Sequence, residues 1–188
     1  MSYIETPPDY RFPWYVRLFL ANQRRRYGRE LEPARLWGRS PKVFAALSLL
    51  YGALDRNSSP IEPALRTLIT VRVSQINWCA FCIDINSATG LKRGLTAAHL
   101  ADLPEFENSM LFDARTKAAL AYAEAVTHTG RHVSPALMAR LKQHFDDDAI
   151  IELTALIAFQ NLSSKFNSAL DVQAQGFCDT SLRAKHPG

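Results

Sequence analysis

The sequence predicts an all-α protein, and three observations favour this fold class. Three Ser-Pro pairs each open an apolar periodic run, as an N-cap serine followed by proline at the first helical position does. The pairs are Ser40-Pro41, Ser59-Pro60 and Ser134-Pro135. The segment from 147 to about 170 opens with acidic residues and carries a broad apolar face. No alternating strands joined by an Asn-Gly or Asp-Gly turn are found.

Seven or eight helices are expected along the chain. The first, over about 13–27, carries Trp14, Leu18 and Phe19 on one side. The segment 61–76 holds β-branched residues that suit a strand, but its length favours a helix, and Ser59 and Glu62 have capping-box spacing. The remaining helices are expected at 41–55, about 80–92, shortly after Thr96, 114–127, 135–144 and 147 to about 170.

Length and composition are typical of one soluble globular domain. The 188 residues are 47% hydrophobic and 21% charged, which excludes fibrous and wholly disordered classes. No apolar stretch approaches the roughly 20 residues that cross a bilayer, and Glu5 and Asp9 stand where a secretory signal would be basic and then apolar. We expect a cytoplasmic protein with an N-terminal helical arm (1–39), a main domain (40–172) and a C-terminal tail (173–188).

The net charge of +4 is concentrated near the N-terminus, where residues 1–56 carry ten Lys or Arg against five Asp or Glu. The densest part is Arg24 to Arg26 with Arg29. So small an excess near a helix end is more typical of a solvated face or a subunit contact than of nucleic-acid binding. The first helix could lie on a membrane surface, but packing on the core or a second subunit is commoner. We therefore expect neither nucleic acid nor membrane as a partner.

Two of the three cysteines, Cys79 and Cys82, form a CxxC motif where one helix pattern stops and the next begins. Residues i and i+3 share a helix face, so the sulfurs can form a disulfide, and the free amides of a first turn stabilise a thiolate. Two buried cysteines without chemistry are the main alternative. Zinc needs about four ligands, and neither the histidines nor Cys178 offers a second pair at ligand spacing. We expect no metal and no cofactor.

Further residues accompany the motif and point to a known family. They are Glu62-Pro63-Ala64-Leu65-Arg66, Gly90, Lys92-Arg93-Gly94-Leu95, and the segments 117–125, 151–161 and 166–170. With Cys79-Ala80-Phe81-Cys82 they resemble the core of the carboxymuconolactone decarboxylase and alkylhydroperoxidase D (AhpD) superfamily over about 40–172. The resemblance implies an AhpD-like helical domain with the CxxC at a helix N-terminus, assembly into dimers, trimers or hexamers, and thiol peroxidase chemistry.

Two positions depart from that family pattern. The family has a glutamate twelve residues before the first cysteine, where this chain has Thr67, and a histidine four residues after the second, where it has Asn86. In the family these groups move protons, which threonine and asparagine cannot do near neutral pH. Asp84 is expected to point away from the sulfur of Cys82. Restoring both family residues is expected to raise peroxidase activity, and whether His99 or His132 reaches the pair is open.

The resemblance favours a slow thiol peroxidase, with Cys82 attacking a hydroperoxide, Cys79 resolving, and a dithiol partner supplying electrons. The alternative is a relative that kept the fold and the dithiol as a redox-responsive binding or assembly module. Decarboxylation is a weaker third reading, because it needs acid and base residues. A homo-oligomer is expected to cover the apolar side chains of Trp14, Phe19 and Phe44.

Overall fold

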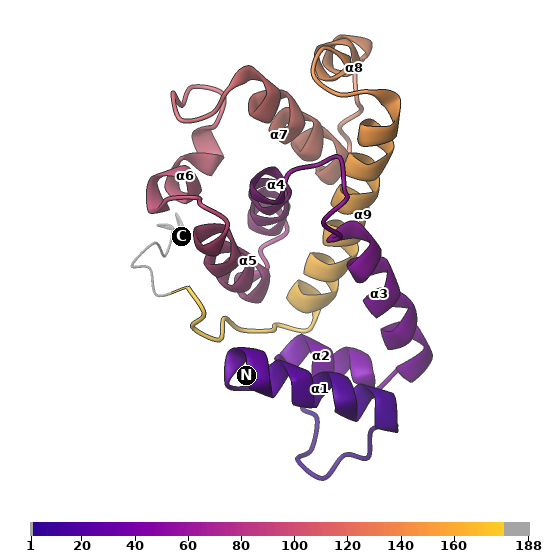
Figure 1. Ribbon diagram of the computed structural model, residues 1–188. Helices are drawn as coiled ribbons and strands as arrows, with labels where there is room; N and C mark the ends of the chain where they lie inside the picture. Colours follow the sequence, from indigo (N-terminus) through magenta and orange to yellow (C-terminus); the bar gives the residue numbers. More distant parts are fainter. Residues whose placement is uncertain (1, 179–188) are drawn as a thin grey trace.

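The computed structural model describes residues 2–178, and over this range it is all helical, as the sequence predicts. The helices pack around one central helix, α4, and the N-terminal pair α1 and α2 lies at one end of the molecule (Figure 1). The elements are α1 (Trp14–Tyr27), α2 (Glu32–Gly38), α3 (Pro41–Leu54), α4 (Pro63–Ile76), α5 (Ala80–Lys92), α6 (Ala97–Asp102), the 3-10 helix η1 (Leu103–Glu105), α7 (Ala114–Thr127), α8 (Pro135–Lys142) and α9 (Asp147–Ala169).

Helix α4 contains the β-branched run that also suited a strand. It packs against α5, α7 and α9, and Ile69, Val71 and Val73 are all at most 1% exposed. A helix surrounded by other helices gains enough from burial to offset the modest helical penalty of β-branched residues. Tertiary packing therefore decides the conformation of this segment.

The start of α4 differs from the expectation. The helix begins at Pro63 with Glu62 as its N-cap residue, so the predicted start at Ser59-Pro60 is wrong. Proline disfavours helical backbone at the residue before it, so Glu62 is extended and cannot be part of the helix. Pro63 then occupies the first helical position, which suits proline. The hydroxyl of Ser59 instead donates to the Glu152 carboxylate of α9 at 3.0 Å.

The other helix starts follow their local signals. Ser134 caps α8 by accepting the N–H of Leu137 at 3.1 Å, and Asp146 caps α9 by accepting that of Ala149 at 2.8 Å. Ser40 precedes α3 as expected, although its side chain makes no capping bond. The predicted helices over 80–92 and 114–127 have the bounds of α5 and α7.

Helix α2 was not predicted, and it joins the N-terminal segment to the rest of the chain. Its Trp37 ring stacks on Phe166 of α9, with the ring centroids 3.6 Å apart. A Cβ atom at Gly38 would lie 2.9 Å from side-chain atoms of both Phe12 and Val16, so only glycine permits this close approach. The boundaries proposed at 39/40 and 172/173 stay a prediction.

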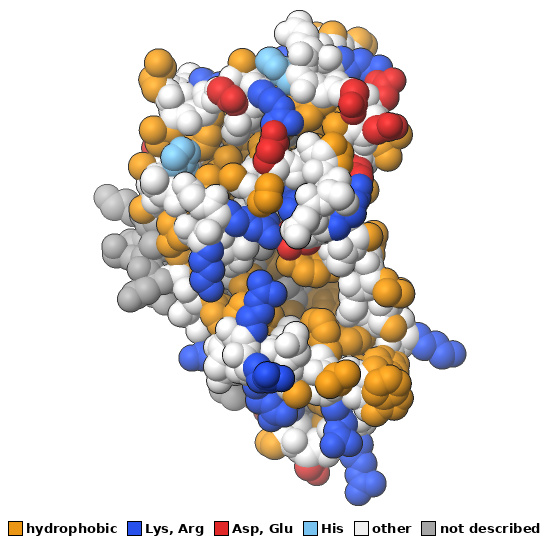
Figure 2. Space-filling view, viewed as in Figure 1, with side chains coloured by type: hydrophobic (Ala, Val, Ile, Leu, Met, Phe, Trp, Pro, Cys, Tyr) orange, Lys and Arg blue, Asp and Glu red, His pale blue; other side chains and the backbone are white. Residues whose placement is uncertain are grey.

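An exposed apolar surface covers parts of α1 and α3, visible as orange side chains towards the lower end of the molecule in Figure 2. Trp14, Leu18 and Leu49 are 75%, 65% and 77% exposed. Phe44 is only 6% exposed because it packs inside the chain against Phe19, so the expectation that it needs cover from a second chain is wrong. The homo-oligomer stays a prediction. None of the helices within 2–178 is long and apolar enough to span a membrane.

The packing of α9 predicts a matched pair of stability changes. Ile157 is 0% exposed in the core, whereas Ile151 on the same helix is 66% exposed. Ile157→Val is expected to lower the free energy of unfolding by about 0.5–1.5 kcal/mol, because it removes a buried methylene. Ile151→Val should change it by less than about 0.5 kcal/mol. Urea unfolding measures both, and equal effects would contradict the packing described for α9.

Candidate functional site

The two cysteines lie at the turn between α4 and α5 and form a disulfide, with their Cα atoms 5.2 Å apart. Cys79 is the N-cap residue of α5, and its sulfur accepts the N–H of Cys82 at 3.1 Å. The turn is tight because Trp78 adopts the left-handed region with φ 55°. The sequence prediction of a CxxC pair at a helix N-terminus is confirmed.

The C-terminal half of α9 fixes this turn. Asn77 donates through Nδ2 to the Asn161 side chain at 2.8 Å and to the Ser164 hydroxyl at 2.9 Å. The hydroxyl of Ser168 donates to the carbonyl of Asn77. These hydrogen bonds hold Asn77, two residues before Cys79, against α9. They therefore set the position of Cys79 relative to α9.

The pair is buried in an apolar cluster, with Cys79 1% and Cys82 3% exposed. The cluster contains Phe81 of α5, Leu36 of α2 and Val172 of the C-terminal segment. Groups from two distant parts of the chain, α2 and the C-terminal segment, thus pack with Phe81 around the sulfurs, so α2 takes part in building the site.

Asn167 of α9 makes a polar contact with Cys82 that was not predicted from the sequence. Its Nδ2 donates to the sulfur of Cys82 at 3.2 Å, and the residue is 1% exposed. Among the described residues, its Oδ1 atom has no hydrogen-bond partner. The residue belongs to the segment 166–170 that carries the family resemblance. Its contact with Cys82 joins residues 85 apart in the sequence, and no local pattern predicts such a contact.

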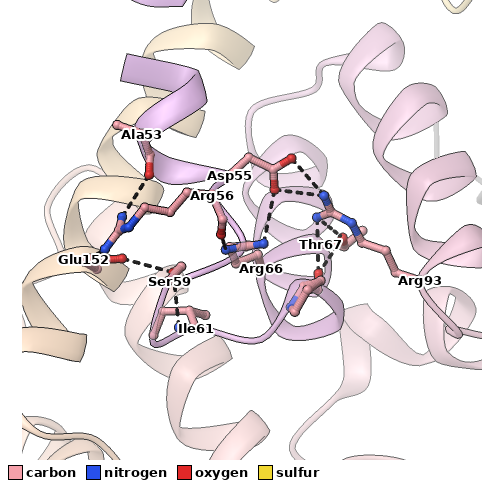
Figure 3. Close-up of polar contacts among 10 residues, drawn as sticks. Ala53, Asp55, Arg56, Ser59, Ile61, Arg66, Thr67, Arg93 and Glu152 are labelled. Atoms are coloured by element: carbon pink, nitrogen blue, oxygen red, sulfur yellow. Dashed lines mark hydrogen bonds and ion pairs between the residues drawn. The ribbon is translucent and has the colours of Figure 1, made fainter. Parts of the chain in front are cut away.

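Thr67 is 2% exposed and serves a structural network (Figure 3). Its hydroxyl donates to the carbonyl of Pro63 at 2.9 Å and accepts from Nη1 of Arg93 at 3.2 Å. Its methyl group lies 3.1 Å from where a Cβ atom at Gly90 would be, so the side chain packs near the far end of α5. Asn86, the other departing position, is half-buried on α5, one turn after Cys82.

An ion-pair network continues from Thr67 and joins α3, α4 and α5 (Figure 3). Arg93 binds both carboxylate oxygens of Asp55, at 2.8 and 2.9 Å. Arg66, which is 4% exposed, reaches Asp55 at 3.4 Å. At the position where the family pattern has a glutamate that moves protons, this chain therefore has Thr67, which hydrogen-bonds to the Arg93 of this ion-pair network.

Asp84 does not face the disulfide but holds the C-terminal segment. Its carboxylate accepts backbone N–H groups from Gln175 at 2.9 Å, Phe177 at 3.1 Å and Cys178 at 2.7 Å. Arg29, from the N-terminal basic cluster, adds a bond from its guanidinium to the Gln175 carbonyl at 3.1 Å. This segment brings Val172 and Phe177 onto the cluster that buries the cysteines.

A cavity of about 170 Å³ lies between α1, α2, α3 and α9 and reaches Phe81 and Asn167 beside the cysteines. Figure 2 shows the surface hollowed between the α1–α2 pair and α3. Tyr51 lines this cavity, and although 57% of its surface is exposed, desolvation by surrounding protein and the nearby Asp55 carboxylate raise its pKa. A phenol is already neutral near pH 7 at its ordinary pKa of about 10, so the upward shift keeps the Tyr51 hydroxyl a hydrogen-bond donor.

The two histidines left open by the sequence lie elsewhere. His99 is engaged in the cap of α6 through Thr96, and its ring contacts Phe112. His132 is exposed in the loop before α8. Within residues 2–178, no group of three or more His, Cys, Asp or Glu is arranged to hold a metal ion.

Comparison with known proteins places the chain in a family. The sequence matches the carboxymuconolactone decarboxylase family over residues 41–125. It is 42% identical to the protein YnjA of Escherichia coli K12 over 172 residues, which cover 92% of this chain and 94% of YnjA. The chain belongs to the carboxymuconolactone decarboxylase family. The family resemblance identified in the sequence over about 40–172 is confirmed.

Solved structures show that this family member has an AhpD-like fold. An alkylhydroperoxidase AhpD core protein from Ralstonia eutropha JMP134, described as peroxidase-related, superposes with a TM-score of 0.83 at 20% identity and 94% coverage of both chains. The debrominase Bmp8 in its apo form superposes with a TM-score of 0.76 at 21% identity, covering 87% of this chain and 88% of Bmp8. At these identities the likeness concerns the fold.

Proposed function

We propose that this protein is a thiol-dependent peroxidase that reduces an organic hydroperoxide with the Cys79–Cys82 dithiol. The observation that carries the proposal is the pair itself, which is disulfide-bonded at the start of α5 with an amide donor on the sulfur of Cys82. Family membership and the peroxidase-related structural relatives support the same chemistry.

In the proposed reaction, the Cys82 thiolate attacks the terminal oxygen of the hydroperoxide. An S–O bond forms, the O–O bond breaks, and the products are a sulfenic acid at Cys82 and an alkoxide that takes a proton to become the alcohol. The thiol of Cys79 then attacks the sulfenic sulfur, the disulfide forms and water leaves. The two electrons come from the dithiol, and an external dithiol restores it by exchange.

The site stabilises a thiolate by dipoles rather than by a proton acceptor. In the first turn of α5 the N–H of Cys82 donates to the sulfur of Cys79, and the positive end of the helix dipole favours a thiolate by about 0.3–1 kcal/mol where exposed and more where buried. The Asn167 amide adds a hydrogen bond to Cys82. Thr67 and Asn86 supply no acid or base near neutral pH, so we expect slow turnover.

The proposal is tested by measuring hydroperoxide consumption with dithiothreitol as electron donor, beside a count of free thiols before and after peroxide. Catalytic turnover with one disulfide formed per peroxide is the expected result. Oxidation of the thiols without turnover would favour the second candidate, a redox-responsive module. The near-complete burial of both cysteines is what favours that candidate, because it hinders repeated access by a donor.

Asn86→His is expected to raise kcat/KM by about tenfold, because a positioned imidazole can accept or return a proton. A glutamate at position 67 would lie beside the guanidinium of Arg93, which contacts the Thr67 hydroxyl, and would pair with it. We therefore expect the histidine at position 86, and not a glutamate at position 67, to raise the activity. The added activity should rise with pH through about 6.5 as the imidazole loses its proton. Asn57→His, at an exposed position outside the site, is the control; the same gain there would argue against proton transfer at 86.

A further inference from the structure

We propose that the cavity between α1, α2, α3 and α9 is the hydroperoxide-binding pocket of the Cys82 site, and that it takes hydroperoxides carrying a single aromatic ring. The inference rests on the proposed function and specifies its substrate class. Three features carry it: the size of the cavity, its aromatic lining, and the unpartnered amide oxygen beside the sulfur.

The cavity has the size and the lining that suit one ring. Its volume is about 170 Å³, and an engineered apolar cavity of about 150 Å³ is known to bind benzene. Aromatic side chains from five helices surround the space, and such walls pack rings edge-to-face or offset. They are Phe19, Trp37, Phe44, Tyr51, Phe81 and Phe159.

Asn167 lines this cavity and also contacts the sulfur of Cys82, which lies behind it and is not itself part of the lining. Its Nδ2 is occupied by Cys82, whereas its buried Oδ1 has no partner within residues 2–178. Leaving such an acceptor unpaired costs free energy, which a ligand with an O–H donor would recover. A hydroperoxide supplies this donor at the oxygen that the thiolate attacks.

The amide would thus orient both reactants. Its oxygen accepts the O–H of the terminal peroxide oxygen, while its N–H group donates to the sulfur that attacks this oxygen. The organic group of the hydroperoxide then extends along the aromatic walls, away from Cys82. Hydrogen peroxide makes the same polar contact but leaves the aromatic part of the cavity unfilled, so the pocket discriminates in favour of the larger substrate.

The test compares a variant that fills the cavity with a matched one that does not. Ser48 on α3 lines the cavity, and Ala46 on the same helix is exposed. Ser48→Phe is expected to lower kcat/KM for cumene hydroperoxide by about tenfold or more, and to change the value for hydrogen peroxide by less than about twofold. Ala46→Phe should leave both values as in the wild type.

A second readout does not depend on catalysis. Titration calorimetry of the oxidised protein with 2-phenyl-2-propanol, the alcohol formed from cumene hydroperoxide, should show saturable binding that Ser48→Phe abolishes and Ala46→Phe retains. If the wild type reduces neither peroxide, the proposed function is wrong, and this titration alone decides whether the cavity binds the ring.

Three outcomes would contradict the proposal that this cavity binds the hydroperoxide. The first is no binding of the alcohol to the wild type. The second is an equal loss of activity on both peroxides in Ser48→Phe. The third is a change of subunit number in Ser48→Phe, seen by light scattering together with the loss of binding, because it would assign this face to a second copy of the chain.

Discussion

Cys82→Ser is expected to lower dithiol-dependent reduction of hydroperoxide by at least about a thousandfold, because the nucleophile is removed. A serine hydroxyl is not ionised near neutral pH and cannot form a disulfide with Cys79. The substitution changes little else, since the oxygen still accepts from Asn167 and occupies nearly the same buried volume. The rate of cumene hydroperoxide loss with dithiothreitol measures the effect.

Two further cysteine variants separate the roles. Cys178→Ser keeps the backbone N–H that binds Asp84, so activity should stay within about twofold of the wild type. Cys79→Ser should consume one equivalent of peroxide and stop at a sulfenic acid that dimedone traps at Cys82. A sulfenic acid trapped at Cys79 in the Cys82→Ser protein instead would reverse the assigned roles.

Asp84→Ala is expected to release the C-terminal segment and open the disulfide to reductants. The Asp84 carboxylate accepts three backbone N–H groups from this segment. Hydrogen bonds to a charged acceptor are worth about 1.5–3 kcal/mol each, and every 1.4 kcal/mol lost raises the open population about tenfold. Losing the equivalent of one of these three bonds would already raise the open population about 10- to 100-fold, so we expect dithiothreitol to reduce the disulfide at least that much faster.

Appearance of free thiols measures this rate, and hydrogen exchange locates the opening. The amides of Gln175, Phe177 and Cys178 should lose protection in Asp84→Ala, while those of α4 keep it. Asp148→Ala removes the same charge from an exposed position on α9 and is the control. Unchanged reduction of the disulfide in Asp84→Ala would show that the segment does not limit access to the cysteines.

Local sequence signals were sufficient for most helices. Helix α7 begins at Ala114 as predicted because Asp113 caps it by accepting the N–H of Thr116 at 2.7 Å. Short α2 escaped prediction because its stability comes from contacts such as the Trp37–Phe166 stack, which no local pattern contains. At Ser59, a tertiary partner on α9 replaced the expected capping role.

In the candidate site, too, local features could be predicted from the sequence and tertiary contacts could not. The positions of Cys79 and Cys82 followed from their spacing at a helix start. The contact of Asn167 with Cys82 joins residues 85 apart, and those of Asp84 with the C-terminal segment join residues 91 to 94 apart. Such pairings depend on how α9 and the tail fold back over α5, which a single sequence does not specify.

A single-turnover experiment tests the central claim most directly. The fully reduced protein is mixed with one equivalent of cumene hydroperoxide, and thiols, alcohol and peptide disulfides are quantified over time. The account predicts one 2-phenyl-2-propanol formed for every two thiols lost, with Cys79 and Cys82 joined in one peptide. Peroxide that persists beside unreacted thiols, or alcohol formed without the Cys79–Cys82 disulfide, would contradict it.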